Sequence, residues 1–524
     1  MTEIQDYLLK LVLEIDDICE AHGIEYVLFG GASLGIERNE GFLPWDDDLD
    51  LLMTKDNYLK FIEVMKEEKP EGRVIESPEV NEEFPLHFGK YMSTETSGII
   101  RSLAYGNSSA GIWIDIFYLC PLAKDPAEAA EMLGWFQVFC EFQNNRFAEV
   151  PIYVEGLYER YKRVLRMSKL IGRQKTLKWL EKKFDYVKEE DCDKYFLHHA
   201  LTKTVKVYSK RHMQKIVRRS FEGHMLPFCA TNREISREAY GDEWMMVPDV
   251  PEQEVHDAIL DTGVPFSEYI NDYMQYLDKD EVDKDLLKYK KSELYFRQNK
   301  YKVEKEILEL DAILKAEEIN RNAAEKYRKI KDKDDARSEF AAWFEELEES
   351  IGARKFASYD IIPEPNPSIM VPYLEHLIRI RGKWTTASLM LADCKKISEN
   401  DRASLDRSID FSRRASIARY DLEDMEAMDK VIKEYREEDD GHMKEIDMAE
   451  IVLAYYRKEF DRMKTLCEEN EEIYGETDVT LMARAALCNM SGDEQARNNY
   501  IEKIKETSCN GLLLLNIRNG VYGF

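Results

Sequence analysis

The spacing of apolar and polar residues predicts an α/β arrangement at the start of the chain. Residues 2–22 place apolar side chains on one helical stripe, formed by Ile4, Leu8, Leu11, Ile15 and Ile18. We predict buried strands over 24–29 and 48–53 and a helix over 56–66. The segment from Gly111 to Leu119 is the clearest strand, because its nearly unbroken apolar run ends before Pro121.

The pattern becomes mainly helical from about residue 126. Proline-containing loops return between 227 and 265, and we place the end of a first domain, 1–275, after them. Residues 276–360 are strongly charged and are expected to form a long helical connector. Residues 361–524 are expected to form an all-helical domain.

The last domain contains a weak internal repeat. Residues 456–463 and 490–497 have similar helix–turn–helix contexts, and the second segment begins 34 positions after the first (490 against 456). Residues 419–425 resemble a looser third copy. A period of about 34 residues is typical of tetratricopeptide-type helix pairs. An irregular helical bundle is the alternative, and either form offers a surface for a protein partner or for self-association.

Composition narrows the class of protein. The formal net charge is -29, which argues against general binding to nucleic acid backbones. The N-terminal residues lack the basic start and apolar run of a secretory signal, and we find no apolar stretch long enough to span a membrane. The nine cysteines form no C-x-x-C pair, which favours free thiols in a reducing compartment. We therefore expect a cytoplasmic protein.

A glycine pair follows the first predicted strand. Gly30 and Gly31 lead into Ala32-Ser33, and glycines at the start of a helix let backbone N–H groups approach a phosphate closely. The pattern is neither a dinucleotide-binding G-x-G-x-x-G nor a P-loop. On its own it is also compatible with an ordinary strand-to-helix turn.

Two carboxylates dominate the next predicted strand. Side chains alternate along a strand, so Asp48 and Asp50 are expected on one face, about 7 Å apart along the chain. Like charges on one face repel each other unless a cation neutralises them, and oxygen ligands suit Mg²⁺ or Mn²⁺. A solvated acidic loop is the alternative, but the leucines between the acids argue against it.

Asp115 is the candidate for a third carboxylate. It is the single charge in the strongly apolar segment 112–117, and burying a lone carboxylate is costly unless it is paired or bound to a metal. Pairing with an Arg or Lys is the structural alternative. Two glycines, an Asp-x-Asp and a later Asp on a strand are the pattern of the nucleotidyltransferase fold, in which metals bridge carboxylates and phosphates.

These segments together resemble the LicD family, which includes bacterial phosphocholine transferases and is related to fukutin-type proteins. The resemblance rests on 30–38 and 41–50, above all on the Pro-Trp-Asp-Asp-Asp-x-Asp element at 44–50, and continues in order to about residue 260. The further matching segments are 88–91, 111–117, 221–223, Pro227, 240–242, Pro248 and His256.

The resemblance implies an α/β (α+β) nucleotidyltransferase-like domain with a small mixed sheet. It implies transfer of a substituted phosphate, such as phosphocholine, from a CDP-linked donor to a hydroxyl of a cell-surface glycan or its lipid-linked precursor. It gives metal binding to Asp48 and Asp50, and makes Asp115 a third ligand or the general base. The residues expected to contact the donor phosphates are Gly30, Gly31, Ser33, Arg38 and Lys90.

Several alternatives stay open beside this implication. Arg38 is equally well interpreted as a structural partner of Asp46-Asp47. Ala32 stands where the family commonly has Thr or Ser, and Asn39-Glu40 replace basic residues, so substrate preference is expected to differ. Transfer of a whole nucleotide to the acceptor would use the same carboxylates, and a non-catalytic helical scaffold is a further interpretation.

Two acid-free basic segments interrupt the acidic chain, at 161–180 and 201–221. We interpret them either as a surface facing an anionic substrate or membrane, or as ordinary solvated helix faces. His198-His199 near Cys192 lacks a second cluster with zinc-ligand spacing. His87 and His256 are expected to have packing roles.

Overall fold

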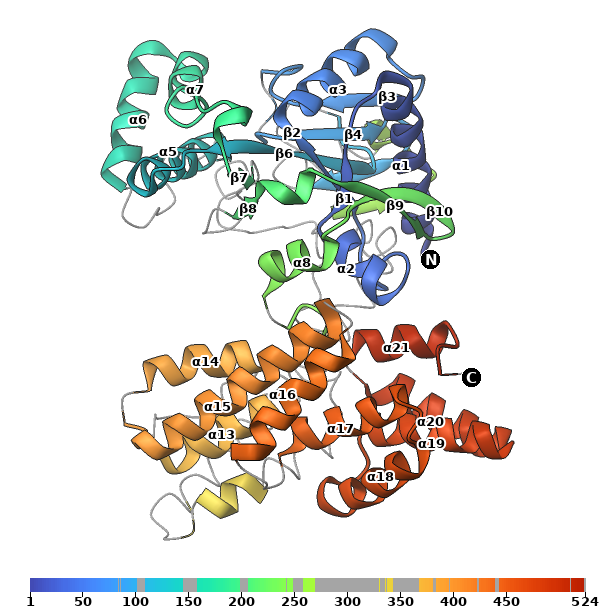
Figure 1. Cartoon of the computed structure of the whole chain (residues 1–524). Coiled ribbons are helices and arrows are strands. Elements are labelled where there is room, and N and C mark those ends of the chain that lie inside the picture. The colour runs from blue at the N-terminus through green and yellow to red at the C-terminus, as the bar shows by residue number, and fades with distance from the viewer. Residues whose placement is uncertain are drawn as a thin grey trace. The chain divides into compact units, whose positions relative to one another are not determined.

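The computed structural model describes most of the chain, which is drawn in Figure 1. The expected boundaries near 275 and 360, and almost all of the expected connector, lie outside the described residues. The described residues are 1–82, 84, 86–100, 109–144, 158–197, 206–241, 243–247, 258–268, 329, 335, 337–342, 367–379, 383–394, 396–421, 424–438, 443–508 and 510–522.

The chain divides into two compact units, each of which combines segments that are distant in the sequence. The first consists of Met1–Ile36, Glu40–Ile235 and Glu254–Glu304. The second consists of Glu37–Asn39, Ser236–Gln253 and Lys305–Phe524. The described part of the first unit is α/β and that of the second is predominantly helical, as the sequence predicts.

A seven-stranded mixed sheet organises the first unit. Its strands follow the order β1-β2-β6-β4-β3, and β7 pairs with β6 and with β8. Strands β2 and β6 are parallel, whereas the other neighbours are antiparallel. The strands are β1 Val27–Phe29, β2 Asp50–Thr54, β3 Arg73–Glu76, β4 Gly89–Ser93, β6 Trp113–Leu122, β7 Lys194–Leu197 and β8 Val207–Ser209.

The predicted N-terminal helix is confirmed as α1, Glu3–His22. It begins with a capping box between Thr2 and Gln5, and it ends at Gly23, whose φ of 60° suits a glycine. The predicted stripe contributes to the main core, in which Leu8, Leu11 and Ile15 are buried. Helix α1 thereby contributes part of the apolar layer against which the sheet packs.

The other predicted elements exist with shifted ends. The strand expected over 24–29 is hydrogen-bonded only from Val27, and the strand expected over 48–53 begins at Asp50. The helix expected over 56–66 extends over Lys55–Glu68, as α3. The strand expected over 111–119 runs over Trp113–Leu122. Pro121, which was expected to end the strand, lies within it.

The expectation of mainly helical structure after residue 126 is wrong in part. Helices α5 (Pro126–Asn144), α6 (Tyr158–Ile171) and α7 (Arg173–Glu181) are present, but strands return afterwards. Besides β7 and β8, the hairpin β9 (Ile216–Phe221) and β10 (His224–Cys229) lies in this region. A second two-stranded sheet pairs β5 (Ser97–Ile100) with β11 (Ala258–Asp261). Short strands with charged outer faces resemble helix surfaces in the sequence.

Two further short helices each follow directly after a strand of the first unit. Helix α2, Gly31–Arg38, follows β1 directly, and α8, Asn232–Tyr240, follows the β9–β10 hairpin. The Asn232 side chain donates to the Ser33 carbonyl at 2.9 Å, which joins the beginnings of α8 and α2. Residues far apart in the sequence thus fix the turn after β1.

The second unit contains successive helices that pack against their neighbours (Figure 1). Helices α18 and α20 begin at Phe460 and Glu494, 34 positions apart, so the two segments noted in the sequence lie at equivalent helix–turn–helix connections. A tetratricopeptide relationship stays a prediction. The helices are α13 Pro367–Arg379, α14 Trp384–Asp393, α15 Glu399–Ser416, α16 Met425–Glu438, α17 Lys444–Tyr456, α18 Phe460–Tyr474, α19 Asp478–Ser491, α20 Glu494–Thr507 and α21 Gly511–Arg518.

Helix lengths and compositions bear on membrane insertion. Among the residues that the structure describes, every helix is either too short or too polar to cross a bilayer.

Candidate metal centre

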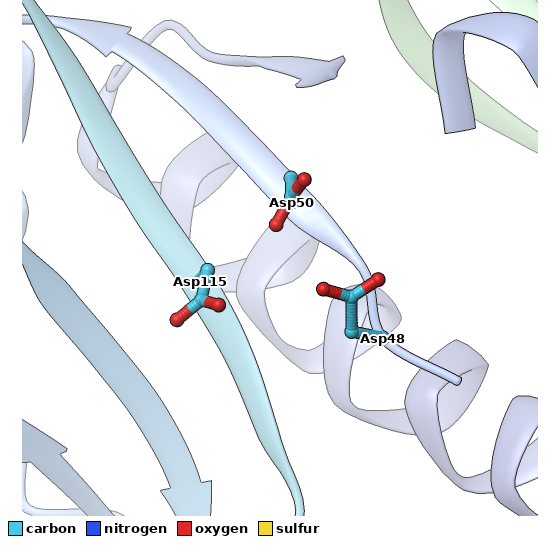
Figure 2. A group of neighbouring side chains, drawn as sticks. All are labelled: Asp48, Asp50 and Asp115. Carbon is cyan, nitrogen blue, oxygen red and sulfur yellow. The ribbon is translucent and has the colours of Figure 1, made fainter. Parts of the chain in front are cut away.

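Three carboxylates lie together near the beginnings of two adjacent strands of the sheet. Asp50 is the first residue of β2, and Asp115 lies opposite it on the parallel neighbour β6. Asp48 precedes β2, and one oxygen from each of the three side chains lies within 4.8 Å of the others. Figure 2 shows the three carboxylates grouped beside these adjacent strands. The sequence predicted these three residues, and the register of β2 and β6 explains why Asp50 and Asp115 lie opposite each other.

The position of Asp48 differs from the prediction in one respect. It lies in the loop before β2 rather than on the strand, so strict alternation does not place it beside Asp50. The loop nevertheless brings its carboxylate into the group. Asp48 and Asp50 are therefore brought together by the conformation of the loop before β2 and not by the alternation of side chains along a strand.

The grouping is electrostatically unfavourable without a cation. Burial raises the pKa of Asp50 well above its usual range, and the negative charges of Asp48, Asp115 and Asp46 raise it further. Lys90 acts in the opposite direction. Hard divalent cations bind carboxylate oxygens and would offset this repulsion, so the donor set fits Mg²⁺ or Mn²⁺.

Lys90 is the buried cation of the site. It lies opposite Asp115 in the antiparallel pair of β4 and β6, and its Nζ is 2.5 Å from Asp115 Oδ1. The two side chains are only 3% and 7% exposed. Lys90 Nζ also lies 4.3 Å from the centre of the Trp113 ring, and Trp113 Nε1 donates to Asp115 Oδ2 at 3.2 Å. Both oxygens of Asp115 therefore contact donors from the sheet.

Comparison with known proteins identifies the family of the segment that carries these residues. The model of the LicD/FKTN/FKRP nucleotidyltransferase domain matches residues 23–118, which include all three carboxylates and Lys90. Residues 23–118 are a LicD-family domain. The chain is also similar to the lipopolysaccharide cholinephosphotransferase LicD of Haemophilus influenzae, with 42% identity over 62 residues. That match covers 12% of this chain and 23% of the relative, so less than a quarter of the relative's length is spanned.

The glycine pair of the LicD-family domain contacts its acids closely. A Cβ atom on Gly30 would lie 2.1 Å from Asp50 Oδ2, and one on Gly31 would lie 2.0 Å from Asp46 Oδ2. Gly30 also has a φ of 61°, which side chains disfavour. A side chain at either position would therefore have to displace a carboxylate oxygen. Their expected contact with donor phosphates stays a prediction.

Ser33 and Arg38 of α2 contact the protein backbone. The buried Ser33 hydroxyl is 3.4 Å from the Leu28 carbonyl, to which it donates. The buried Arg38 guanidinium donates through Nη2 to the Trp244 carbonyl, and burial lowers the pKa of Arg38 to about 10. Phosphate binding by either residue, and pairing of Arg38 with Asp46-Asp47, stay predictions.

Two residues that the sequence analysis did not assign hold the loop that carries the acids. The buried Gln5 of α1 donates through Nε2 to the carbonyls of Leu43 and Asp46, both at 2.9 Å. Glu222, in the β9–β10 turn, accepts from the Phe42 N–H at 3.0 Å and donates its own N–H to the Glu40 carbonyl at 2.9 Å. These contacts brace residues 40–46 from two distant elements.

The histidines add little to the site. His87 is buried among aromatic rings, including Phe88 and Phe139, and its Nε2 lies 3.7 Å from Cys140 Sγ. This environment agrees with a packing role. His198, His199 and His256 lie outside the described residues.

Proposed function

We propose that this chain is a phosphotransferase that moves a substituted phosphate, such as phosphocholine, from a CDP-linked donor to a hydroxyl of a cell-surface glycan or its lipid-linked precursor. The observation that carries the proposal is the convergence of Asp48, Asp50 and Asp115 within 4.8 Å in a LicD-family domain. The Haemophilus influenzae relative is named a lipopolysaccharide cholinephosphotransferase, which supports phosphocholine as the transferred group and a cell-surface glycan as the acceptor class.

The three carboxylates would hold a Mg²⁺ or Mn²⁺ ion. Their oxygens are the ligands that these cations prefer. Burial and the neighbouring carboxylates both raise the pKa of Asp50, and a bound cation would offset the repulsion between the carboxylates. When bound, such an ion polarises the phosphoryl oxygens and offsets the negative charge that develops during transfer. The protein contributes the positions of the ligands: the register of β2 and β6 places Asp50 opposite Asp115, and the loop before β2 places Asp48 beside them.

The remaining roles belong to residues beside the carboxylates. Lys90 adds a positive charge next to Asp115, where it helps to neutralise the phosphate in the transition state. Gly30 and Gly31 lead into α2, whose first N–H groups favour an anion. Asp115 is either the third metal ligand or the base that takes the proton of the acceptor hydroxyl, and its ion pair with Lys90 holds it in place for both roles.

Nucleotidyl transfer is the second candidate function, because it uses the same carboxylates and the same fold. The two reactions differ in their products. A CDP-linked donor releases CMP when the substituted phosphate is transferred, whereas a nucleoside triphosphate releases pyrophosphate when the nucleotide is transferred. A helical scaffold without catalysis would produce neither product.

The experiment is a product analysis of the full-length chain with Mg²⁺ and separate panels of CDP-linked donors and nucleoside triphosphates. We expect CMP from a CDP-linked donor, loss of that CMP in Asp50→Asn, and no loss in Asp17→Asn, an exposed acid on α1. Pyrophosphate in place of CMP would identify nucleotidyl transfer. Neither product, together with no donor-dependent rise in melting temperature, would contradict both reactions.

A further inference from the structure

An unusual combination of charge and exposed apolar surface occurs where α6 meets α7. Helix α6 buries Tyr161 and Val164, and on its opposite side it exposes cations and one leucine. The positions 163, 166 and 170 are spaced i, i+3 and i+7, so they share one face of the helix. These exposed residues are Arg163, Arg166, Lys169 and Leu170.

Helix α7 repeats this arrangement. Its buried side chains are Thr176, Leu177 and Leu180. The exposed cations Lys175, Lys178 and Lys182 are also spaced i, i+3 and i+7, the last of them at the C-terminal end of the helix. The two helices lie beside each other in Figure 1 and are joined through Gly172, whose φ is 86°. Each helix therefore presents a cationic stripe.

The corner between the two helices is apolar and open. Leu170 is 84% exposed and Ile171 is 44% exposed, although both are large aliphatic side chains. A Cβ atom added to Gly172 would meet no other atom within 4 Å, so the space directly beside Gly172 is open as well. Single exposed apolar residues are common, but an adjacent exposed aliphatic pair between two cationic helices is not explained by packing.

Five exposed cations around the corner have no ion-pair partner among the described residues. They are Arg163, Arg166, Lys169, Lys175 and Lys182. By contrast, the neighbouring Arg160 pairs with Glu131. The chain as a whole has a formal net charge of -29, so this group of unpaired positive charges is a local exception to an acidic protein. It would attract an anionic surface to this corner and orient the chain toward it.

We propose that the α6–α7 corner docks on a bilayer surface that contains anionic lipids. Leu170 and Ile171 enter the boundary between headgroups and acyl chains, and the cations of both stripes contact the headgroups. The apolar pair favours a lipid surface over a soluble polyanion, because a polyanion offers no apolar phase for these side chains. The proposal concerns binding alone and does not depend on the phosphotransferase reaction.

The experiment is co-sedimentation of the full-length chain with vesicles of phosphatidylcholine alone and with vesicles containing phosphatidylglycerol. We expect binding only to the anionic vesicles, and weaker binding at high salt. Replacing Arg163, Arg166 and Lys169 with Ser should weaken binding at least about tenfold. The double substitution Leu170→Ser and Ile171→Ser should also weaken it, at unchanged charge.

Matched controls separate this surface from general charge and hydrophobicity. Replacing the exposed Lys396, Lys430 and Lys464 with Ser makes the same change in net charge in the helical unit. Leu389→Ser removes another exposed leucine, which is 68% exposed. Neither control should change binding. No binding to anionic vesicles would overturn the proposal, and so would binding that resists the Leu170/Ile171 substitutions, because it would identify the corner as a site for soluble polyanions.

Discussion

The carboxylate of Asp50 occupies the space where a side chain at Gly30 would begin. A Cβ atom at position 30 would lie 2.1 Å from Asp50 Oδ2, well inside the contact distance of real atoms. The glycine after β1 and the first acid of β2 are therefore coupled by shape, across an antiparallel strand pair. The turn expected to bind phosphate and the proposed metal ligand Asp50 therefore share one contact.

Gly30→Ala should weaken Mn²⁺ binding more than it weakens folding. The added methyl displaces the Asp50 carboxylate, and the positive φ of residue 30 adds a backbone cost of about 1–2 kcal/mol. Mn²⁺ titration and chemical denaturation of the same variant measure the two effects.

Gly23→Ala is the matched control for this substitution. Gly23 has nearly the same φ, 60°, but a Cβ atom there meets nothing within 4 Å. It should lose a similar free energy of unfolding and bind Mn²⁺ normally. Equal loss of Mn²⁺ affinity in both variants would show that the Gly30–Asp50 contact does not govern the site.

Removing the buried cation should destabilise the first unit strongly. Lys90→Met leaves Asp115 in a buried environment without its ion-pair partner, which typically costs about 3–5 kcal/mol. Lys66→Met breaks the exposed pair with Glu63 and should cost less than about 1 kcal/mol. Urea denaturation monitored by tryptophan fluorescence compares them, and a similar small loss for both would contradict the importance of the buried pair.

The Gln5 side chain should position the acids without touching a ligand. Gln5→Leu keeps most of the volume but removes the donor to the Leu43 and Asp46 carbonyls. We expect Mn²⁺ affinity to fall roughly tenfold, as is typical when a support behind metal ligands is lost. Gln5→Glu, which also lacks the amide donor, should behave similarly. Unchanged affinity in both variants would remove Gln5 from the site.

Glu222 offers a test in which the conservative variant rescues the effect. Glu222→Ala removes the acceptor for the Phe42 N–H, whereas Glu222→Gln retains an amide oxygen at that position. We expect weaker Mn²⁺ binding in the alanine variant and nearly normal binding in the glutamine variant. Equal weakening in the two variants would indicate that the charge of Glu222, rather than its hydrogen bond, is required.

Much of the site was predictable because the sequence patterns that mark its acids each lie within a few neighbouring residues. Asp48 and Asp50 are separated by a leucine, and Asp115 is the single charge of an apolar strand, so each is visible within a few residues. Which strands neighbour each other is not visible in this way. The pairing of Lys90 with Asp115 depends on the register of β4 and β6, so the sequence analysis, which expected Lys90 to contact phosphate, could not name this partner.

The supporting residues were missed because their partners are distant. Gln5 could be recognised as a capping residue with Thr2, but its amide contacts carbonyls about forty positions away. Glu222 contacts Phe42, which is 180 positions away. Arg38 was assigned to phosphate or to Asp46-Asp47, and its hydrogen bond to the distant Trp244 carbonyl was not foreseen. Hydrogen bonds of this kind follow from the fold and leave no periodic trace in the sequence.

Binding of Mn²⁺ to the full-length chain, followed by electron paramagnetic resonance of the free ion, measures whether the three carboxylates form a metal site. We predict one saturable Mn²⁺ per chain that Mg²⁺ displaces. Affinity should fall more than about tenfold in Asp50→Asn, because loss of a direct ligand exceeds the usual effect of losing a supporting residue. It should be unchanged in Asp17→Asn. Equal binding in the wild type and in Asp50→Asn would contradict the proposed centre.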